Sequence, residues 1–123
     1  MSQEVPPGLR AQIARLQKLQ EELQYVVAAK QQWQLQLSEV ESALEELEKL
    51  EGGRQVYKIV GTIMVSRDRE SLLNELKERK ETISLHLDTL KRQEDMLRKQ
   101  IDELNRKIMS SLGGEKASGG QAA

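Results

Sequence analysis

Two long tracks of apolar residues most constrain the fold of this chain. The first runs from Leu9 to Leu47 and the second from Leu73 to Ile108, each in alternating steps of three and four residues. An apolar residue every 3.5 positions on average is typical of a left-handed coiled coil, because a slightly under-wound helix keeps its apolar seam against a partner helix. The sequence therefore predicts two long helices that pack through narrow seams.

Each predicted helix has recognisable end signals. Pro6 and Pro7 suit a helix entrance, and Gly52–Gly53 suit an exit. Asp68 is a predicted N-cap, with Glu70 in the first turn of the second helix. The predicted segments are a flexible N-terminal segment (1–8), a first helix (9–51), a middle segment (52–68), a second helix (69–112) and a disordered tail (113–123).

The two helices are nearly equal in length, about 60–65 Å each at 1.5 Å per residue, which predicts that the chain folds back on itself. An antiparallel register that pairs Leu47 with Leu73 also pairs Leu16 with Leu104. A shift by one heptad keeps the same layers, so this register is a hypothesis. Lys30 and Glu94 interrupt the seams one layer apart, where they either pair or simply solvate a narrow seam.

The middle segment "VYKIVGTIMV", residues 56–65, breaks the heptads with β-branched residues on both sides of Gly61. Such runs predict a β-hairpin, whose turn type stays open because Gly61 is not part of an Asn-Gly pair. An isolated two-stranded hairpin is marginal in water, and its edges leave N–H and C=O groups unpaired.

We therefore expect hairpins from several subunits to pair into a closed sheet. The alternative is a hairpin folded back on its own helices. The predicted oligomerisation residues are Val56, Tyr57, Ile59, Val60, Gly61, Ile63 and Val65.

Several kinds of site are not expected. The chain has no cysteine and one histidine, His86, which is predicted to be an exposed surface residue, so a metal site is not expected. The segment "EGGRQVYK" lacks a phosphate-binding loop. The acidic run "ESALEELEKLE" is predicted to be a solvated helix face, because acid–base catalysis needs a pocket. We expect no enzymatic activity and no cofactor.

Charge and hydropathy narrow the expected partners and location. The net charge is −1, with 32% charged residues of both signs, which does not favour nucleic acid or an anionic membrane. The N-terminus lacks a signal-peptide pattern, and no apolar run approaches the ~20 residues of a membrane span. The expected location is the cytoplasm.

The segment "VYK-x-VG" at 56–61, placed between two long heptad helices, resembles the β-type subunit of archaeal-like prefoldin. The resemblance covers about residues 9–112, and one predicted hairpin rather than two favours the β-type over the α-type. It implies a hexamer of two α-type and four β-type subunits, joined by a β-barrel platform from which coiled-coil arms extend. It further implies ATP-independent holding of unfolded proteins at the arm tips and their delivery to a group II chaperonin.

In such an arm both chain ends lie at the tip, where helices fray. Ile13 lies outside the strict seam and needs no partner within the chain, and Met109 also lies beside the seam, where its side chain can adapt to different partners. We expect Ile13, Met109 and Leu112 to contact client proteins, with extra packing within the coil as the alternative. For Leu16 and Leu104, packing within the coil is the preferred interpretation. The predicted client-binding residues are Leu9, Ile13, Leu16, Ile108, Met109 and Leu112.

A second hypothesis is a structural coiled-coil spacer or tethering subunit of a larger complex. A spacer can be distinguished from a chaperone by one measurement: a chaperone suppresses the aggregation of an unrelated denatured protein, and a spacer does not. Nucleic-acid binding through a basic helix face is a weaker third hypothesis.

Overall fold

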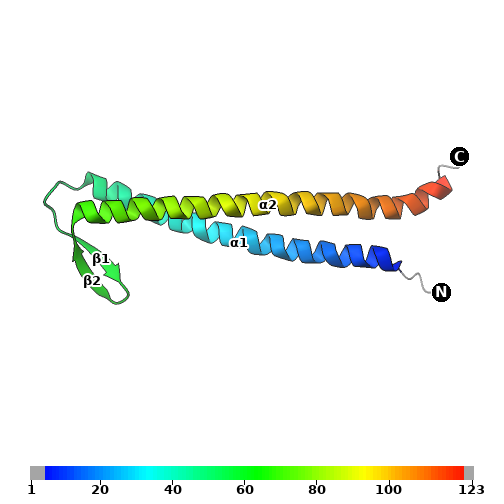
Figure 1. The fold of residues 1–123 in the computed structure, drawn as a ribbon, viewed down its shortest axis with the longest axis horizontal. Helices are drawn as coiled ribbons and strands as arrows, with labels where there is room; N and C mark the ends of the chain where they lie inside the picture. The colour runs from blue at the N-terminus through cyan, green and yellow to red at the C-terminus, as the bar shows by residue number, and fades with distance from the viewer. Residues whose placement is uncertain (1–4, 121–123) are drawn as a thin grey trace. The chain divides into compact units, whose positions relative to one another are not determined.

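The computed structural model describes residues 5–120, and side chains within residues 5–113. It contains helix α1 (Pro7–Lys49), strands β1 (Val56–Val60) and β2 (Ile63–Arg67), and helix α2 (Arg69–Gly120) (Figure 1). The predicted fold class, two long helices with one short antiparallel hairpin between them, is confirmed.

The helix starts follow the predicted signals. Pro7 is the first residue of α1, and the carbonyl oxygen of Pro6 accepts a hydrogen bond from Arg10 N at 2.9 Å. Asp68 caps α2, because its Oδ2 accepts a hydrogen bond from Ser71 N at 3.3 Å.

The helix bounds differ from the prediction at three places. Helix α1 begins at Pro7, within the predicted flexible segment, and ends at Lys49 rather than at residue 51. The chain then turns at residues 51–54, where Gly53 has a φ of 92°, as the third position of a type II turn requires. Helix α2 continues to Gly120, past the predicted end at Leu112. Residues 1–4 and 121–123 of the predicted end segments lie outside the described residues.

The chain divides into two compact units, which we describe separately. The hairpin unit comprises residues 30–89, and the terminal unit combines residues 1–29 with residues 90–123. Each unit contains a stretch of α1 packed against a stretch of α2.

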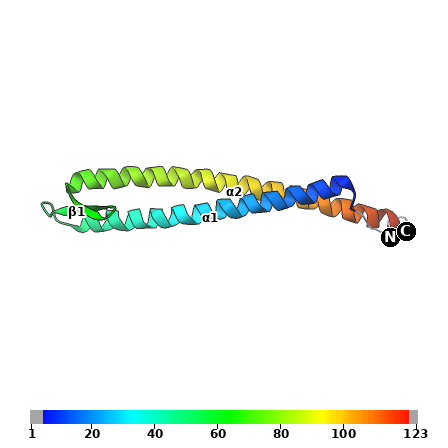
Figure 2. The same cartoon turned by 90° about the horizontal axis from the view of Figure 1, so that it is seen from below.

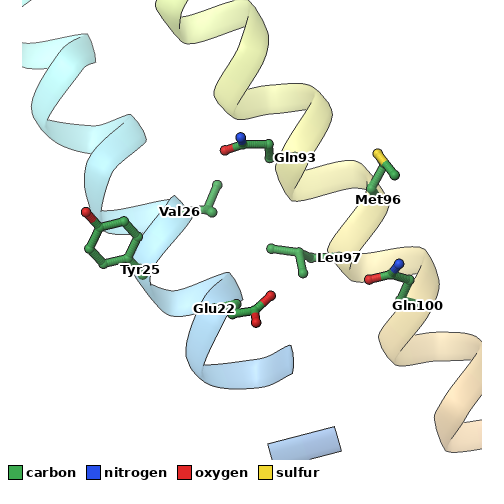
Figure 3. Close-up of a pocket in the computed structure, with 7 residues that line it drawn as sticks. All are labelled: Glu22, Tyr25, Val26, Gln93, Met96, Leu97 and Gln100. Carbon is green, nitrogen blue, oxygen red and sulfur yellow. The ribbon is translucent and has the colours of Figure 1, made fainter. Parts of the chain in front are cut away.

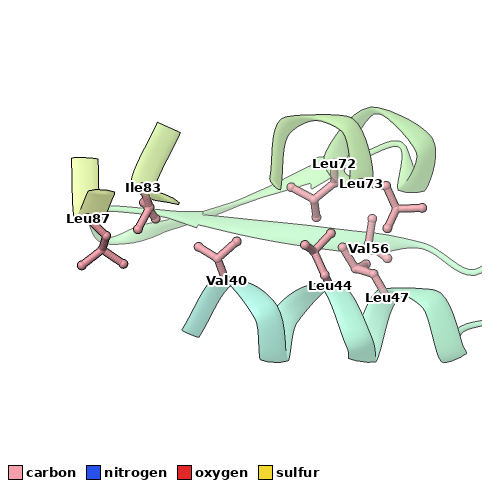
Figure 4. Close-up of a cluster of buried hydrophobic side chains, with 8 residues drawn as sticks. All are labelled: Val40, Leu44, Leu47, Val56, Leu72, Leu73, Ile83 and Leu87. Carbon is pink, nitrogen blue, oxygen red and sulfur yellow. The ribbon is translucent and has the colours of Figure 1, made fainter. Parts of the chain in front are cut away.

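The hairpin unit has a core built from both helices and the first strand (Figure 4). The rings of Trp33 on α1 and His86 on α2 lie 4.2 Å apart between centroids. Arg79 donates a hydrogen bond to Oε1 of Gln36 at 3.4 Å, so later residues of α2 meet earlier residues of α1, as an antiparallel pair requires. The buried core residues are Val40, Leu44, Leu47, Val56, Leu72, Leu73, Ile83 and Leu87.

The terminal unit has its own core, in which Leu16 and Leu104 belong to one cluster, as predicted. Its buried members are Leu19, Ile101, Leu104 and Ile108. The seam carboxylate Glu94 is also buried, and its Oε2 accepts hydrogen bonds from Nε and Nη2 of Arg98 at 3.0 and 2.8 Å. A pairing of Lys30 with Glu94 stays a prediction.

The hairpin turns at Gly61–Thr62, between the paired residues Val60 and Ile63. Gly61 has a φ of 60°, whereas Thr62 has no positive φ. A glycine at the first central position with this geometry defines a type II′ turn, whose twist matches the twist of the flanking strands. The sequence left the turn type open, and the structure decides it. Figure 2 shows β1 beside the adjoining ends of α1 and α2.

Candidate functional site

The hairpin exposes a set of large apolar side chains that its own helices do not cover. Two-stranded pairing also leaves both outer strand edges without a neighbouring strand among residues 5–120. Apolar faces beside open edges are the features that strand addition from another chain would cover. The exposed apolar residues of the hairpin are Tyr57, Ile59, Val60, Ile63, Met64 and Val65.

Met64 is the member of this set that the sequence prediction missed. It pairs with Ile59 across the hairpin. The prediction selected β-branched and aromatic strand residues together with the turn glycine, and Met64 is neither branched nor aromatic. Its position inside the same strand run is the signal that would have identified it.

Val56 does not belong to this exposed surface, which corrects its predicted position on the assembly face. Its side chain is only 6% exposed and packs in the core of its own subunit. Figure 4 shows Val56 among core leucines of both helices. The same core cluster includes Leu73 of the predicted seam and Leu72, which lies beside that seam. At its base, therefore, the hairpin does fold onto its own helices, as the alternative hypothesis expected.

An ion-pair cluster ties both strands to α2. Nζ of Lys58 donates a hydrogen bond to Oε1 of Glu75 at 2.8 Å, and Nη2 of Arg67 lies 3.8 Å from the same oxygen. The hydrogen bond from Lys58 is the main reason that the pKa of Glu75 is lowered, and the charge of Arg67 acts in the same direction. The exposed face of the hairpin is thus held in a defined direction relative to α2.

Arg69 connects the end of α1 to the start of α2. Its Nε donates a hydrogen bond to the carbonyl oxygen of Leu47 at 3.0 Å, and its Nη2 lies 3.5 Å from the carbonyl oxygen of Glu48. These carbonyls belong to the last turn of α1, where carbonyl oxygens carry partial negative charge, and the oxygen of Leu47 also accepts a hydrogen bond from Leu50 N at 3.2 Å. A positive side chain from the next helix therefore caps α1.

The predicted client-binding residues fall into two groups. Leu9, Ile13 and Leu16 are half-buried against the terminal core, and Ile108 is part of it. Ile13 does have a partner within the chain, although its place outside the seam does not require one, because its side chain packs against the terminal core. Met109 and Leu112, by contrast, are exposed. Their apolar surface is open to another molecule.

The remaining predictions concern His86, metal binding and membrane spans. His86 is exposed and contacts Trp33. Within residues 5–113 no group of three or more histidine, aspartate or glutamate side chains has the arrangement of a metal site. A search of the described helices found no stretch that is both long and apolar enough to cross a membrane.

Two long antiparallel helices joined by a single hairpin with exposed apolar residues define a class of coiled-coil subunits. The family model described as "Prefoldin subunit" matches residues 10–115, and the chain belongs to this family. The chain is 43% identical to the prefoldin subunit beta of Pyrobaculum arsenaticum, over 95% of this chain and 98% of that one. It is 44% identical to the prefoldin subunit beta of Caldivirga maquilingensis, over 98% of each.

A solved structure agrees with this assignment. The crystal structure of the prefoldin beta subunit from Thermococcus strain KS-1 matches with a TM-score of 0.83 and 40% sequence identity, over 90% of this chain and 97% of that one. The resemblance to the archaeal β-type subunit is therefore confirmed. These similarities support a prefoldin chaperone function rather than a structural spacer, and prefoldin subunits form oligomeric complexes.

Proposed function

We propose that this chain is the β-type subunit of a hexamer with two α-type and four β-type subunits. The hexamer holds unfolded proteins without ATP in the cytoplasm and passes them to a group II chaperonin. The subunit itself has no enzymatic activity. The observation that carries the proposal is the chain's apolar surface at two places, the hairpin and the chain ends, in a member of the prefoldin family.

The hairpin is the proposed assembly surface. Ile59, Ile63 and Met64 expose apolar area that a lone subunit leaves in water. Pairing with the hairpins of neighbouring subunits covers this area and satisfies the edge N–H and C=O groups in the same step. Val56 and Glu75 act differently, because they attach the hairpin to its own helices.

The chain ends are the proposed client-binding surface. Met109 and Leu112 are exposed, and the half-buried Leu9, Ile13 and Leu16 lie on the opposing helix of the same unit. Helix ends open locally more readily than helix centres, which makes further apolar surface accessible. Methionine suits this role because its flexible side chain adapts to different partners.

Assembly makes such a weak surface useful. One small apolar contact has a dissociation constant of about 1 mM, which corresponds to a free energy of binding of roughly −4 kcal/mol. Several arms on one platform raise the effective concentration of each further contact, and avidity exceeds single-site affinity by ~10²–10⁴. Binding is then strong overall, while each contact releases quickly.

The decisive experiment measures aggregation of a chemically denatured protein, diluted into buffer without nucleotide. The test sample is the full chain mixed with an α-type prefoldin subunit, and its native mass is measured in parallel. We expect suppression of light scattering at stoichiometric concentration. In a separate sample that contains ATP, we expect no ATP hydrolysis. A hexamer that leaves aggregation unchanged would instead favour a spacer, and a chain that stays monomeric with every α-type partner would exclude the assembly role.

A further inference from the structure

The terminal unit contains an open groove between α1 and α2, away from both chain ends. The groove has a volume of about 400 Å³, and its lining is mainly apolar. Val26 and Leu97 form its floor, and Figure 3 shows them pointing toward one another between the helices. Tyr25 and Met96 precede these floor residues, one on each helix, and also line the groove.

Tyr25 and Met96 contribute little to the fold of this chain. Their side chains are 77% and 61% exposed, and neither belongs to the core clusters of the two units. Large apolar side chains on both walls of a groove with an apolar floor present a surface that another apolar group can cover. Their exposure also allows substitution without disturbing the seam.

Two smaller grooves continue this surface along the terminal unit. The second groove shares Glu22 and Gln100 with the first. The third shares Arg15, Leu19 and Gln100 with the second, and extends to Leu104 and Lys107. Leu19 and Leu104, which line these grooves, belong to the same terminal core cluster as Leu16 and Ile108, which are both predicted client-binding residues. The groove system is therefore continuous with the proposed client surface.

The polar groups along the grooves indicate the chemistry of the occupant. Gln93 and Gln100 carry both hydrogen-bond donors and acceptors, which match the N–H and C=O groups of an extended peptide. The charged lining residues have both signs, so the grooves do not select an acidic or a basic segment. These charged residues are Arg15, Lys18, Glu22, Glu103 and Lys107.

The dimensions suit a short extended segment. From Arg15 to Tyr25 the helix rises by about 15 Å at 1.5 Å per residue. An extended chain covers this length with about four to five residues, and every second side chain then faces the same side. An apolar side chain over Val26 and Leu97 fits this spacing.

We propose that the groove at Tyr25, Val26, Met96 and Leu97 is an inner client-binding site, which takes an extended apolar segment of an unfolded protein. This inference rests on the proposed function and adds a second contact on the same arm. A client held at the chain ends extends along the grooves toward this site. Two contacts on each arm raise avidity further, since the second one forms within the bound complex.

The experiment compares matched pairs of substitutions in the full chain assembled with an α-type prefoldin subunit. The test variant is Tyr25→Ser with Met96→Ser. The control is Leu35→Ser with Leu85→Ser, because these residues are each 62% exposed, lie one on each helix, and line none of the grooves described above. A third variant, Met109→Ser with Leu112→Ser, reports on the chain ends. The probe is fluorescent, reduced and carboxymethylated α-lactalbumin, whose binding is measured by anisotropy.

We expect the groove variant to bind the probe roughly tenfold more weakly, the change that follows when one well-packed apolar contact is lost. The control pair should bind as the unsubstituted chain does, and all assemblies should keep the same native mass. Contact is measured directly with a polarity-sensitive dye. Because the chain has no cysteine, Met96→Cys gives a unique attachment site and Leu85→Cys its control. Probe binding should shift the emission to shorter wavelength at residue 96 only.

Three results would overturn the inference. Unchanged affinity and emission for the groove positions, with weakened binding by the chain-end variant, would restrict client contact to the ends. A smaller native mass for the groove variant would indicate that the groove is a contact between subunits and not a client-binding site. Failure of the unsubstituted assembly to bind the probe at all would overturn the proposed function itself, and the two failures are thus distinguishable.

Discussion

Nζ of Lys58 on β1 lies 2.8 Å from Oε1 of Glu75 on α2 and donates a hydrogen bond to it. Arg67 on β2 approaches the same oxygen, so one carboxylate contacts both strands of the hairpin. The exposed residues of the hairpin move with these strands. Glu75 therefore helps, together with the buried Val56, to orient the proposed assembly surface relative to α2.

Replacing Glu75 by glutamine should loosen the hairpin without unfolding the helices. The change keeps the size of the side chain and removes its charge. Because the ion pair is partly solvated, we expect a modest effect, less than about tenfold faster amide hydrogen exchange in β1 and β2. Equal exchange rates in both proteins would show that Val56 and the core alone hold the hairpin.

Acid should loosen the hairpin in the same way. In the folded chain the pKa of Glu75 is lowered from its ordinary value of 4.5, chiefly by the hydrogen bond from Lys58. A group with a lowered pKa stabilises the fold fully above its unfolded value, and this contribution is lost as the pH falls through the folded value. Protection factors of the hairpin amides, which correct for the intrinsic slowing of exchange in acid, should therefore fall below pH 4.5. The Glu75→Gln variant should lack the part of the acid response that comes from Glu75. An identical acid response in the variant and the unsubstituted protein would contradict the role of Glu75.

Val56→Ala should destabilise the subunit itself, because Val56 is buried in its core. Removing buried methyl groups leaves a cavity, and we expect a loss of about 1–2 kcal/mol in the free energy of unfolding. Thermal unfolding followed by circular dichroism measures this change. Ile59→Ala, at an exposed position on the same strand, is the matched control and should leave the stability nearly unchanged.

Val60→Glu with Ile63→Glu should prevent assembly while the helices remain folded. Both residues lie beside the turn and are exposed, so the charges cost little in the lone subunit. In a closed sheet between subunits the same charges would be buried without partners, which is strongly unfavourable. Native mass spectrometry should detect small species with unchanged helical circular dichroism. A full-sized assembly would rule out the platform role of these residues.

Substitutions near the end of α2 should separate client binding from packing. Met109→Ser with Leu112→Ser removes exposed side chains, so we expect weaker capture of denatured protein and unchanged stability. Ile108→Ala removes part of the terminal core, and we expect about 2–4 kcal/mol of destabilisation. Capture assays and thermal unfolding on both variants provide the comparison. If the Met109→Ser, Leu112→Ser variant captures denatured protein normally, these two residues do not form the client-binding surface.

The helices and the hairpin could be predicted because their signals are local. Heptad spacing specifies which helix face is apolar, and Asp68 caps the helix that directly follows it. The predicted position of Val56 on the exposed face was wrong, because its burial has no local signal. Its burial depends on core side chains from both helices, among them Leu72, which lies 16 positions further along the chain and outside the regular seam.

The sequence by itself determined the two-helix architecture, the central hairpin and the apolar character of its strands, since periodicity and β-branched runs act between near neighbours in the chain. Only the tertiary structure decided that Glu75 holds both strands, that Arg69 caps α1, and that Tyr25 and Met96 line one groove. Each of these contacts joins side chains from different elements. Their meeting depends on how helices and strands pack, which no local pattern specifies.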